Sequence, residues 1–187
     1  MPVASPIPSR PLWQWDATEI AAATRSGQVS VTEVTRAVLD RVDAVNPHLN
    51  AITLDLADAA LARAAELDAA RAARAETGPL HGVPVTIKDN VDVAGQRTPN
   101  GLAALAGVIA PEDSPVTANL LAAGVVIVGR TNTPEVSMRP TTNNPLYGLT
   151  RNPWRDDISC GGSSGGVGAS VASGMGALGH GNDIGGS

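Results

Sequence analysis

The sequence predicts an α/β fold in which helices cover a mixed, largely parallel sheet. Two short apolar runs rich in β-branched residues, Val83 to Ile87 and Val125 to Val128, are bounded by glycines, as buried strands often are. Between them, Ser114-Pro115 has the form of a capped helix start and is followed by an apolar helical face. Strands that alternate with a helix favour parallel pairing with helices packed on the sheet.

Residues 1–78 are expected to form a helical segment. Asp16 to Gly27 has an amino-terminal capping residue and a terminal glycine, as a short helix requires. Ser30 opens a capping box, and valines and leucines then recur at helical spacing until Pro47, which is expected to prevent continuation. The alanine-rich stretch from Asp55 to Glu76 has high intrinsic helix propensity.

Residues 79–187 are expected to form the first part of an α/β core in the same single domain. Gly124 is placed to end the helix before the second strand, and Asn143 to Trp154 is punctuated like a long ordered loop. The stretch from Cys160 to Ser187 contains eleven glycines, and five apolar residues are interleaved with them, namely Val167, Val171, Met175, Leu178 and Ile184. That pattern indicates a packed element with close backbone approach and not a flexible linker.

Composition excludes several classes of function. A net charge of −5 with only four aromatic residues argues against a nucleic-acid partner. A single cysteine excludes a disulfide framework, and three scattered histidines offer no zinc spacing, so we expect no metal and no cofactor. The proline-rich start lacks a signal peptide, and no apolar run reaches the roughly 20 residues of a membrane span. We therefore expect a cytoplasmic protein without a membrane partner.

Glycine-rich motifs give three alternatives for chemistry. Gly174 to Gly179 matches a dinucleotide pattern but lacks the strand before it and the helix after it, and Gly161 to Gly166 lacks the lysine of a phosphate loop. Glycine-flanked serines at Ser163-Ser164 and Ser187 suit a nucleophile, because the attacking oxygen and backbone donors must share a small volume. His180 is not obviously placed as a base.

Lys88 is the only lysine, since the other twelve basic residues are arginines. It ends the first predicted strand, where its amine could enter a poorly solvated interior. A desolvated lysine can lose its proton near neutral pH, whereas arginine cannot. The residues alone leave a buried base and a surface lysine equally open.

Six sequence blocks, which begin at Gly82, Gly129, Asn143, Asn152, Cys160 and Gly181, resemble in their order the successive motifs of the amidase signature family. Lys88 precedes Ser163 by 75 residues, and Ser163 precedes Ser187 by 24, which suits that family's Ser-Ser-Lys triad. The resemblance covers about residues 16 to 187.

The resemblance implies a serine hydrolase that cleaves carboxamides through an acyl-enzyme. Ser187 would be the nucleophile, and Ser163, after a cis peptide bond from Gly162, would bridge it to neutral Lys88. The substrate would be a small-molecule amide. The backbone N–H groups of the oxyanion hole would belong to the segment Ile184, Gly185 and Gly186.

This chain departs from the family pattern in length and at two positions, Arg130 and Val136, where relatives commonly have lysine and phenylalanine. Family members are much longer, so the fold is expected to be incomplete here and the isolated 187-residue chain inactive. The complete parent could form a homodimer. Two alternatives stay open: the glutamine-hydrolysing subunit of a tRNA-dependent amidotransferase, and a non-catalytic fragment or pseudoenzyme with an interaction role.

Overall fold

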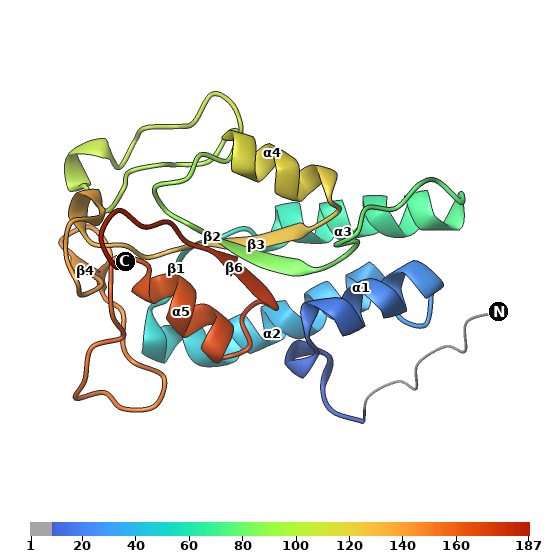
Figure 1. Ribbon diagram of the computed structural model, residues 1–187, viewed down its shortest axis with the longest axis horizontal. Helices are drawn as coiled ribbons and strands as arrows, with labels where there is room; N and C mark the ends of the chain where they lie inside the picture. Colours follow the sequence, from blue (N-terminus) through green and yellow to red (C-terminus); the bar gives the residue numbers. More distant parts are fainter. Residues whose placement is uncertain (1–8) are drawn as a thin grey trace.

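The computed structural model describes residues 9–187 (Figure 1). The prediction that the chain starts without a signal peptide falls mainly on residues 1–8 and lies outside the described residues. From residue 9 onward, no helix combines the length and the apolar character that a membrane crossing demands.

Three helices form the amino-terminal part, and the caps of the first two follow the predictions. The carboxylate of Asp16 accepts a hydrogen bond from the Glu19 N–H, and Gly27 ends the first helix in the left-handed conformation with φ of 77°. Ser30 and Glu33 form the predicted capping box of the second helix. The helices are α1 (Ala17–Ser26), α2 (Val31–Leu49) and α3 (Ala57–Ala72), preceded by a short 3₁₀ turn, η1 (Leu12–Gln14).

The prediction that Pro47 prevents continuation of the second helix is wrong, because α2 runs through it to Leu49. Proline removes one N–H donor, and near a helix end this loss affects few bonds. Asn50 then takes the left-handed conformation and donates its N–H to the Asn46 carbonyl at 2.7 Å. The Asn46 side-chain oxygen accepts from the N–H groups of Ala51 and Ile52, and these bonds carry the chain from the helix end into a strand.

The main sheet has four strands in the order β1-β3-β2-β6. The two predicted strands are its centre and pair in parallel, β6 adds to β2 in parallel, and β1 lies antiparallel on β3. The mixed, largely parallel sheet is therefore confirmed. The strands are β1 (Ile52–Asp55), β2 (Pro84–Lys88), β3 (Val126–Thr131) and β6 (Leu178–His180).

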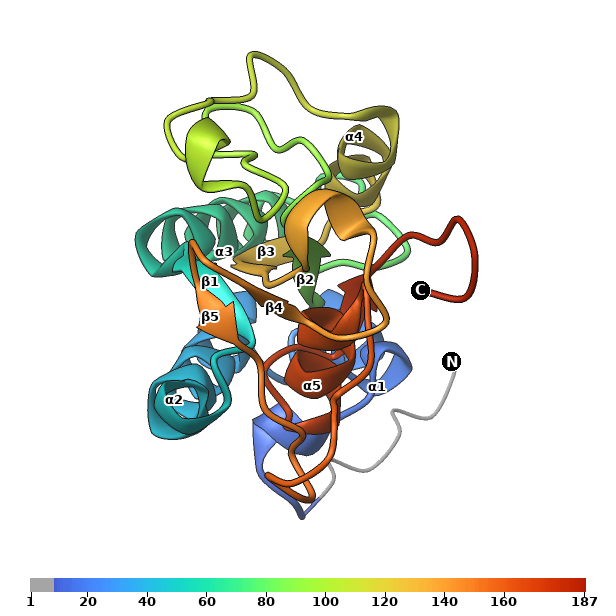
Figure 2. The same cartoon turned by 90° about the vertical axis from the view of Figure 1, so that its left-hand side faces the viewer.

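Helices lie on both sides of this sheet. Figure 1 shows α4 and the long loop before it above the strands, with α1, α2 and α5 below, and Figure 2 agrees from the side. The glycine-rich stretch is packed as predicted where it forms α5 and β6, but the prediction is wrong for residues 182–186, which are exposed, with the Ile184 side chain 89% exposed. The remaining elements are α4 (Pro115–Ala122), α5 (Gly165–Ala172), the 3₁₀ turns η2 (Ala103–Leu105) and η3 (Glu135–Ser137), and the short hairpin of β4 (Asn143–Asn144) and β5 (Gly148–Leu149).

The core is mostly aliphatic, with Trp15 as its buried aromatic residue among the described residues, and the amino-terminal turn supports the carboxyl end of α5. Strand side chains such as Val85 and Ile87 are buried among residues of α1, α2 and α4. Arg41 of α2 stacks over the Trp13 ring at 4.2 Å and donates to the Ser173 carbonyl at the end of α5. These contacts fix the carboxyl end of α5, and the amino end of the same helix lies next to Ser163.

Candidate functional site

Lys88 lies at the carboxyl end of β2, and its side chain is completely buried. The Nζ atom lies 2.7 Å from the Ser163 Oγ and 3.0 Å from the Ser164 Oγ. It also contacts the side-chain oxygen of Asn182 at 2.9 Å and that residue's carbonyl at 3.4 Å. The only lysine of the chain is thus an interior amine surrounded by oxygen atoms.

Burial lowers the pKa of Lys88 to about 8, because a charged ammonium loses its hydration there. The carboxylate of Asp183 opposes this shift and raises the pKa. Between the two effects the amine titrates close to neutral pH. A group of this kind can accept and return a proton during a reaction.

Ser163 follows a cis peptide bond from Gly162 and is buried. Its carbonyl accepts a hydrogen bond from the Thr133 hydroxyl at 3.1 Å. A Cβ atom on Gly162 would lie only 2.6 Å from the backbone nitrogen of Thr141. The glycine before Ser163 is therefore required by the close approach of another backbone segment.

Two further glycines seat α5 directly behind the serine pair. A Cβ on Gly165 would lie 2.3 Å from the Thr142 hydroxyl oxygen, and one on Gly166 would lie 2.5 Å from the Asn132 carbonyl oxygen. These contacts join the start of α5 to the segments that follow β3. The Ser163 hydroxyl is held against Lys88 because the glycines on either side of the serine pair, Gly162 and Gly165, are packed too closely to accommodate a Cβ atom.

The segment from Asp183 to Ser187 is folded back on one carboxylate. The N–H groups of Gly185, Gly186 and Ser187 donate to the Asp183 Oδ1 at 2.7, 2.6 and 2.5 Å. These bonds, led by that from Ser187, lower the pKa of Asp183 to about 2. Gly185 and Gly186, two of the three residues predicted to form an oxyanion hole, thus donate their N–H groups to an internal anion in this structure. The Ile184 backbone also helps to lower the pKa of Asp183, while the Ile184 side chain is exposed.

Ser187 joins the Lys88 cluster through its backbone and not through its hydroxyl. Its carbonyl accepts from the Ser164 Oγ at 3.3 Å. Within residues 9–187 the structure gives no hydrogen bond from the Ser187 hydroxyl to Ser163 or Lys88. Of the three predicted catalytic residues, Lys88 and Ser163 are therefore in direct contact. Ser187 is connected to Lys88 through the Ser164 hydroxyl, which contacts both.

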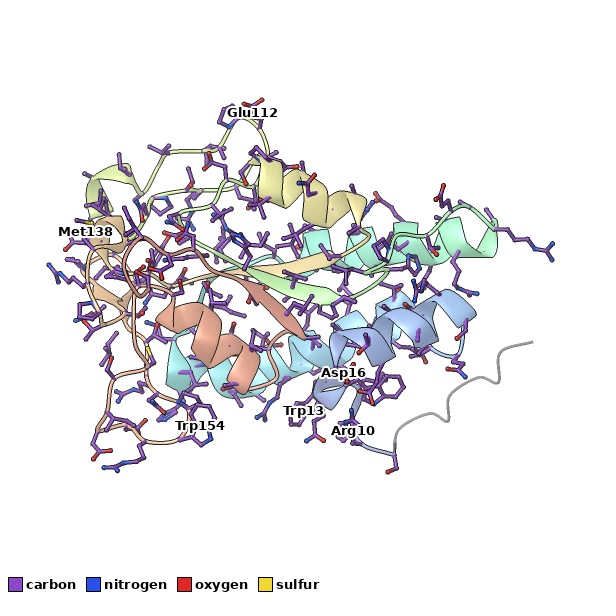
Figure 3. The ribbon with its side chains drawn as sticks, in the orientation of Figure 1. Arg10, Trp13, Asp16, Glu112, Met138 and Trp154 are labelled. Atoms are coloured by element: carbon purple, nitrogen blue, oxygen red, sulfur yellow. The ribbon has the colours of Figure 1, made fainter. Side chains whose placement is uncertain are left out.

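A cavity of about 230 Å³ opens beside this cluster. One wall comes from the turn that contains Met138, which is exposed at the left edge of Figure 3, and the other from the segment that ends at Ser187. The lining residues are Ser137, Met138, Arg139, Pro140, Gly162, Ile184, Gly185, Gly186 and Ser187. The predicted nucleophile and the predicted oxyanion segment thus face the same hollow.

Sequence reasoning missed Ser164, Asn182 and Asn90. Asn182 and Asn90 bond to each other through their side-chain amides, and the first also contacts Lys88. The signal for Ser164 was its place beside Ser163, and that for Asn90 was its position two residues after Lys88. The signal for Asn182 was its place in the last motif block, although neither composition nor spacing gives it a role.

His180 packs at the edge of the site without a catalytic contact. It pairs in register with Ile87 of β2 and is partly buried. Burial lowers its pKa, and the nearby Lys88 charge lowers it further. In the part of the chain that the structure describes, no group of three histidine, cysteine or acidic side chains could hold a metal ion.

Comparison with known proteins matches residues 33–187 to the family described as Amidase. An indoleacetamide hydrolase of Bradyrhizobium diazoefficiens is 56% identical over 180 residues, which are 96% of this chain and 34% of that protein. A glutamyl-tRNA(Gln) amidotransferase subunit of Thermobifida fusca is 44% identical over 94% of this chain and 35% of its own.

The fold has close counterparts among solved structures. A fatty acid amide hydrolase superposes with a TM-score of 0.88 and 32% sequence identity, covering 92% of this chain and 31% of that one. The chain thus spans about a third of the length of the relatives that it matches.

Proposed function

The chain belongs to the amidase signature family, and from that premise we propose that Lys88, Ser163 and Ser187 are the catalytic triad of a carboxamide hydrolase. The products would be a carboxylate and ammonia or an amine. The observation that supports this most directly is the buried Lys88 amine, 2.7 Å from the Ser163 hydroxyl oxygen and with a pKa near 8. An amine in that setting is a competent base for a hydroxyl relay.

In the first half of the proposed reaction, neutral Lys88 accepts the Ser163 proton while Ser163 accepts that of Ser187. The Ser187 oxygen attacks the amide carbon and forms a tetrahedral intermediate. The C–N bond then breaks, and the proton returns through Ser163 to the leaving nitrogen. Water hydrolyses the resulting ester by the same relay, which regenerates Ser187.

The oxyanion would bind to the N–H groups of the segment Ile184, Gly185 and Gly186. In the structure the two glycine N–H groups bond to Asp183. Substrate binding therefore requires the segment to exchange this carboxylate for the substrate oxygen. This rearrangement would also bring the Ser187 hydroxyl toward Ser163.

The substrates that we propose are small aliphatic or aromatic amides. Similarity to an indoleacetamide hydrolase makes a primary arylacetamide the first to test. A second candidate is glutamine hydrolysis for a tRNA-dependent amidotransferase, which the 44% identity to one chain of such an enzyme favours. An independent amidase needs neither tRNA nor ATP, so the two activities are separable. A cytoplasmic location and a homodimer of the complete protein stay predictions.

The test labels the complete protein that contains this chain with a serine-directed fluorophosphonate. We expect an adduct on Ser187, none in Ser187→Ala, and normal labelling in the control Ser26→Ala on α1. Ammonia release is then measured with indole-3-acetamide, with a small aliphatic amide, and with glutamine in the presence and absence of tRNA and ATP. A folded protein that forms no adduct would instead support the non-catalytic, partner-binding alternative.

A further inference from the structure

The amide side chains of Asn90 and Asn182 form a reciprocal pair beside Lys88. Each Nδ2 donates to the other's Oδ1 at 3.2 Å, and the Asn90 Nδ2 also donates to the Ser137 hydroxyl at 3.1 Å. These bonds determine which end of the Asn182 amide faces the lysine. The Oδ1 atom is turned toward the Lys88 Nζ, at 2.9 Å.

The partners of Lys88 differ in whether they can donate a proton. A neutral amine has two hydrogens and one lone pair, and an amide oxygen can only accept. The Ser164 hydroxyl donates to the carbonyl of Asn182 at 3.2 Å or of Ser187 at 3.3 Å, so toward the amine its oxygen is also an acceptor. The two hydrogens of neutral Lys88 are thus directed to Asn182 and Ser164.

We propose that Asn182, clasped by Asn90, is a positioning residue that turns the lone pair of neutral Lys88 toward the Ser163 hydroxyl. With both amine hydrogens directed to the side chains of Asn182 and Ser164, and the Asn182 carbonyl farther away at 3.4 Å, the lone pair faces the Ser163 oxygen, the shortest contact at 2.7 Å. That orientation is the one needed for proton transfer from serine to lysine. This inference rests on the proposed function, since it concerns the direction of the same proton relay.

Other charges around Lys88 come from several elements. Asp183, in the segment after β6, raises its pKa, and the His180 ring lies at the end of β6. On the opposite side, Arg130 of β3 donates to the Lys88 carbonyl at 3.3 Å, with buried Asp89 beside it. A new charge at position 182 would act against this fixed background.

The test compares Asn182→Asp and Asn182→Ala in the complete protein, with Asn119→Asp as the control. Asn119 is exposed on α4, so its replacement makes the same charge change away from the amine. The readout is the pH dependence of fluorophosphonate labelling and of amide hydrolysis. An anion beside Lys88 favours the ammonium, so Asn182→Asp should move the acidic limb of both profiles upward by about 1 pH unit or more.

Asn182→Ala removes the fixed acceptor without adding charge. We expect kcat to fall by about 10-fold or more with little change in KM, because the lone pair is no longer oriented. The inference would be overturned if the pH profiles of Asn182→Asp and Asn119→Asp had the same acidic limb. A normal kcat for Asn182→Ala would overturn it as well. If Asn182→Ala does not fold, the isosteric Asn182→Asp still decides.

Failure of the two proposals can be told apart. A wild-type protein that neither labels nor hydrolyses amides contradicts the proposed function. A wild-type protein that is active, with Asn182 variants that follow the control, contradicts the positioning role alone.

Discussion

The ammonium form of Lys88 is poorly tolerated in its surroundings, and this gives the residue its chemical use. An arginine at the same place would remain protonated at any accessible pH and could not accept a serine proton. We expect Lys88→Arg to reduce the rate of Ser187 acylation at pH 7 to 8 by about 10²- to 10⁴-fold. Fluorophosphonate labelling of the complete protein measures this, with exposed Arg36→Lys on α2 as the control. Near-normal turnover in Lys88→Arg would contradict the neutral-lysine mechanism.

The same pKa shift predicts how stability depends on pH. Lys88 titrates at about 8 in the folded state and near 10.5 when unfolded, so between these values the unfolded chain binds more protons. Folding of the wild type should therefore gain about 3 kcal/mol relative to Lys88→Met as pH rises from 8 to 10.5. Below pH 8 the difference between the two proteins should stay constant. Denaturant unfolding at a series of pH values measures it, and a flat difference across that window would refute the depressed pKa.

Single residues of the site were predictable to different extents from the sequence. Lys88 stands out as the only lysine and lies at the end of a recognisable strand. Ser163 stands out because glycine pairs lie on both sides of the serine pair, a pattern typical of close backbone packing. Asn182 has no such mark, because its role comes from meeting Asn90 across 92 positions of chain. The bonds from Gly185 and Gly186 to Asp183 were equally hidden, since the order of residues does not say which anion a backbone N–H group meets.

At the scale of elements, α5 is where packing determines the geometry of the site. A methyl group on Gly166 would lie 2.5 and 2.6 Å from backbone atoms of Asn132, whereas one on Gly168 would meet nothing within 4 Å. We expect Gly166→Ala to destabilise the protein by about 1–3 kcal/mol and to slow labelling of Ser187. Gly168→Ala, in the same helix, should stabilise it by about 0.5–1 kcal/mol. Thermal unfolding separates the two, and similar effects would show that α5 is not seated as described.

The elements that the sequence predicts correctly have strong local signals. The caps at Asp16 and Ser30, the two buried strands and the Ser114 helix start all depend on neighbouring residues. Strand β1 was missed because four residues between two helical patterns carry too little alternation to be read, and pairing with β3 alone defines it. Pro47 misled for a related reason, since the compensating bonds to Asn46 arise only once the chain turns into β1.

Across the whole molecule, the site lies where distant parts of the chain meet. Lys88 comes from a central strand, Ser163 from the loop two residues before α5, and Ser187 from the segment beyond the edge strand β6. The amino-terminal turn supports the far end of α5 through Trp13 and Arg41. The parallel centre of the sheet and the packed glycines therefore serve one purpose, which is to hold the lysine amine and the Ser163 hydroxyl in contact.

Residues 1–187 produced as a separate polypeptide are expected to be inactive toward amides. In that polypeptide the cavity is lined by Met138 and Ile184, whose exposed fractions of 74% and 89% show that these walls do not enclose a substrate. Ser187 would also carry a terminal carboxylate next to the N–H groups proposed to bind an oxyanion. This negative charge would repel the negatively charged oxygen of the tetrahedral intermediate and raise its free energy. Intact-mass analysis after fluorophosphonate treatment should show no adduct, while the complete protein reacts.

A carboxamide at the carboxyl terminus of the same polypeptide separates the two causes. The carboxamide removes the charge but leaves the cavity open. A partial return of labelling would therefore assign the inhibition to the carboxylate. No return of labelling would assign it to the open cavity. Circular dichroism must first show that both polypeptides retain their helices. Labelling of the unmodified polypeptide at the rate of the complete protein would mean that these 187 residues suffice to bind and activate the reagent, contrary to the prediction.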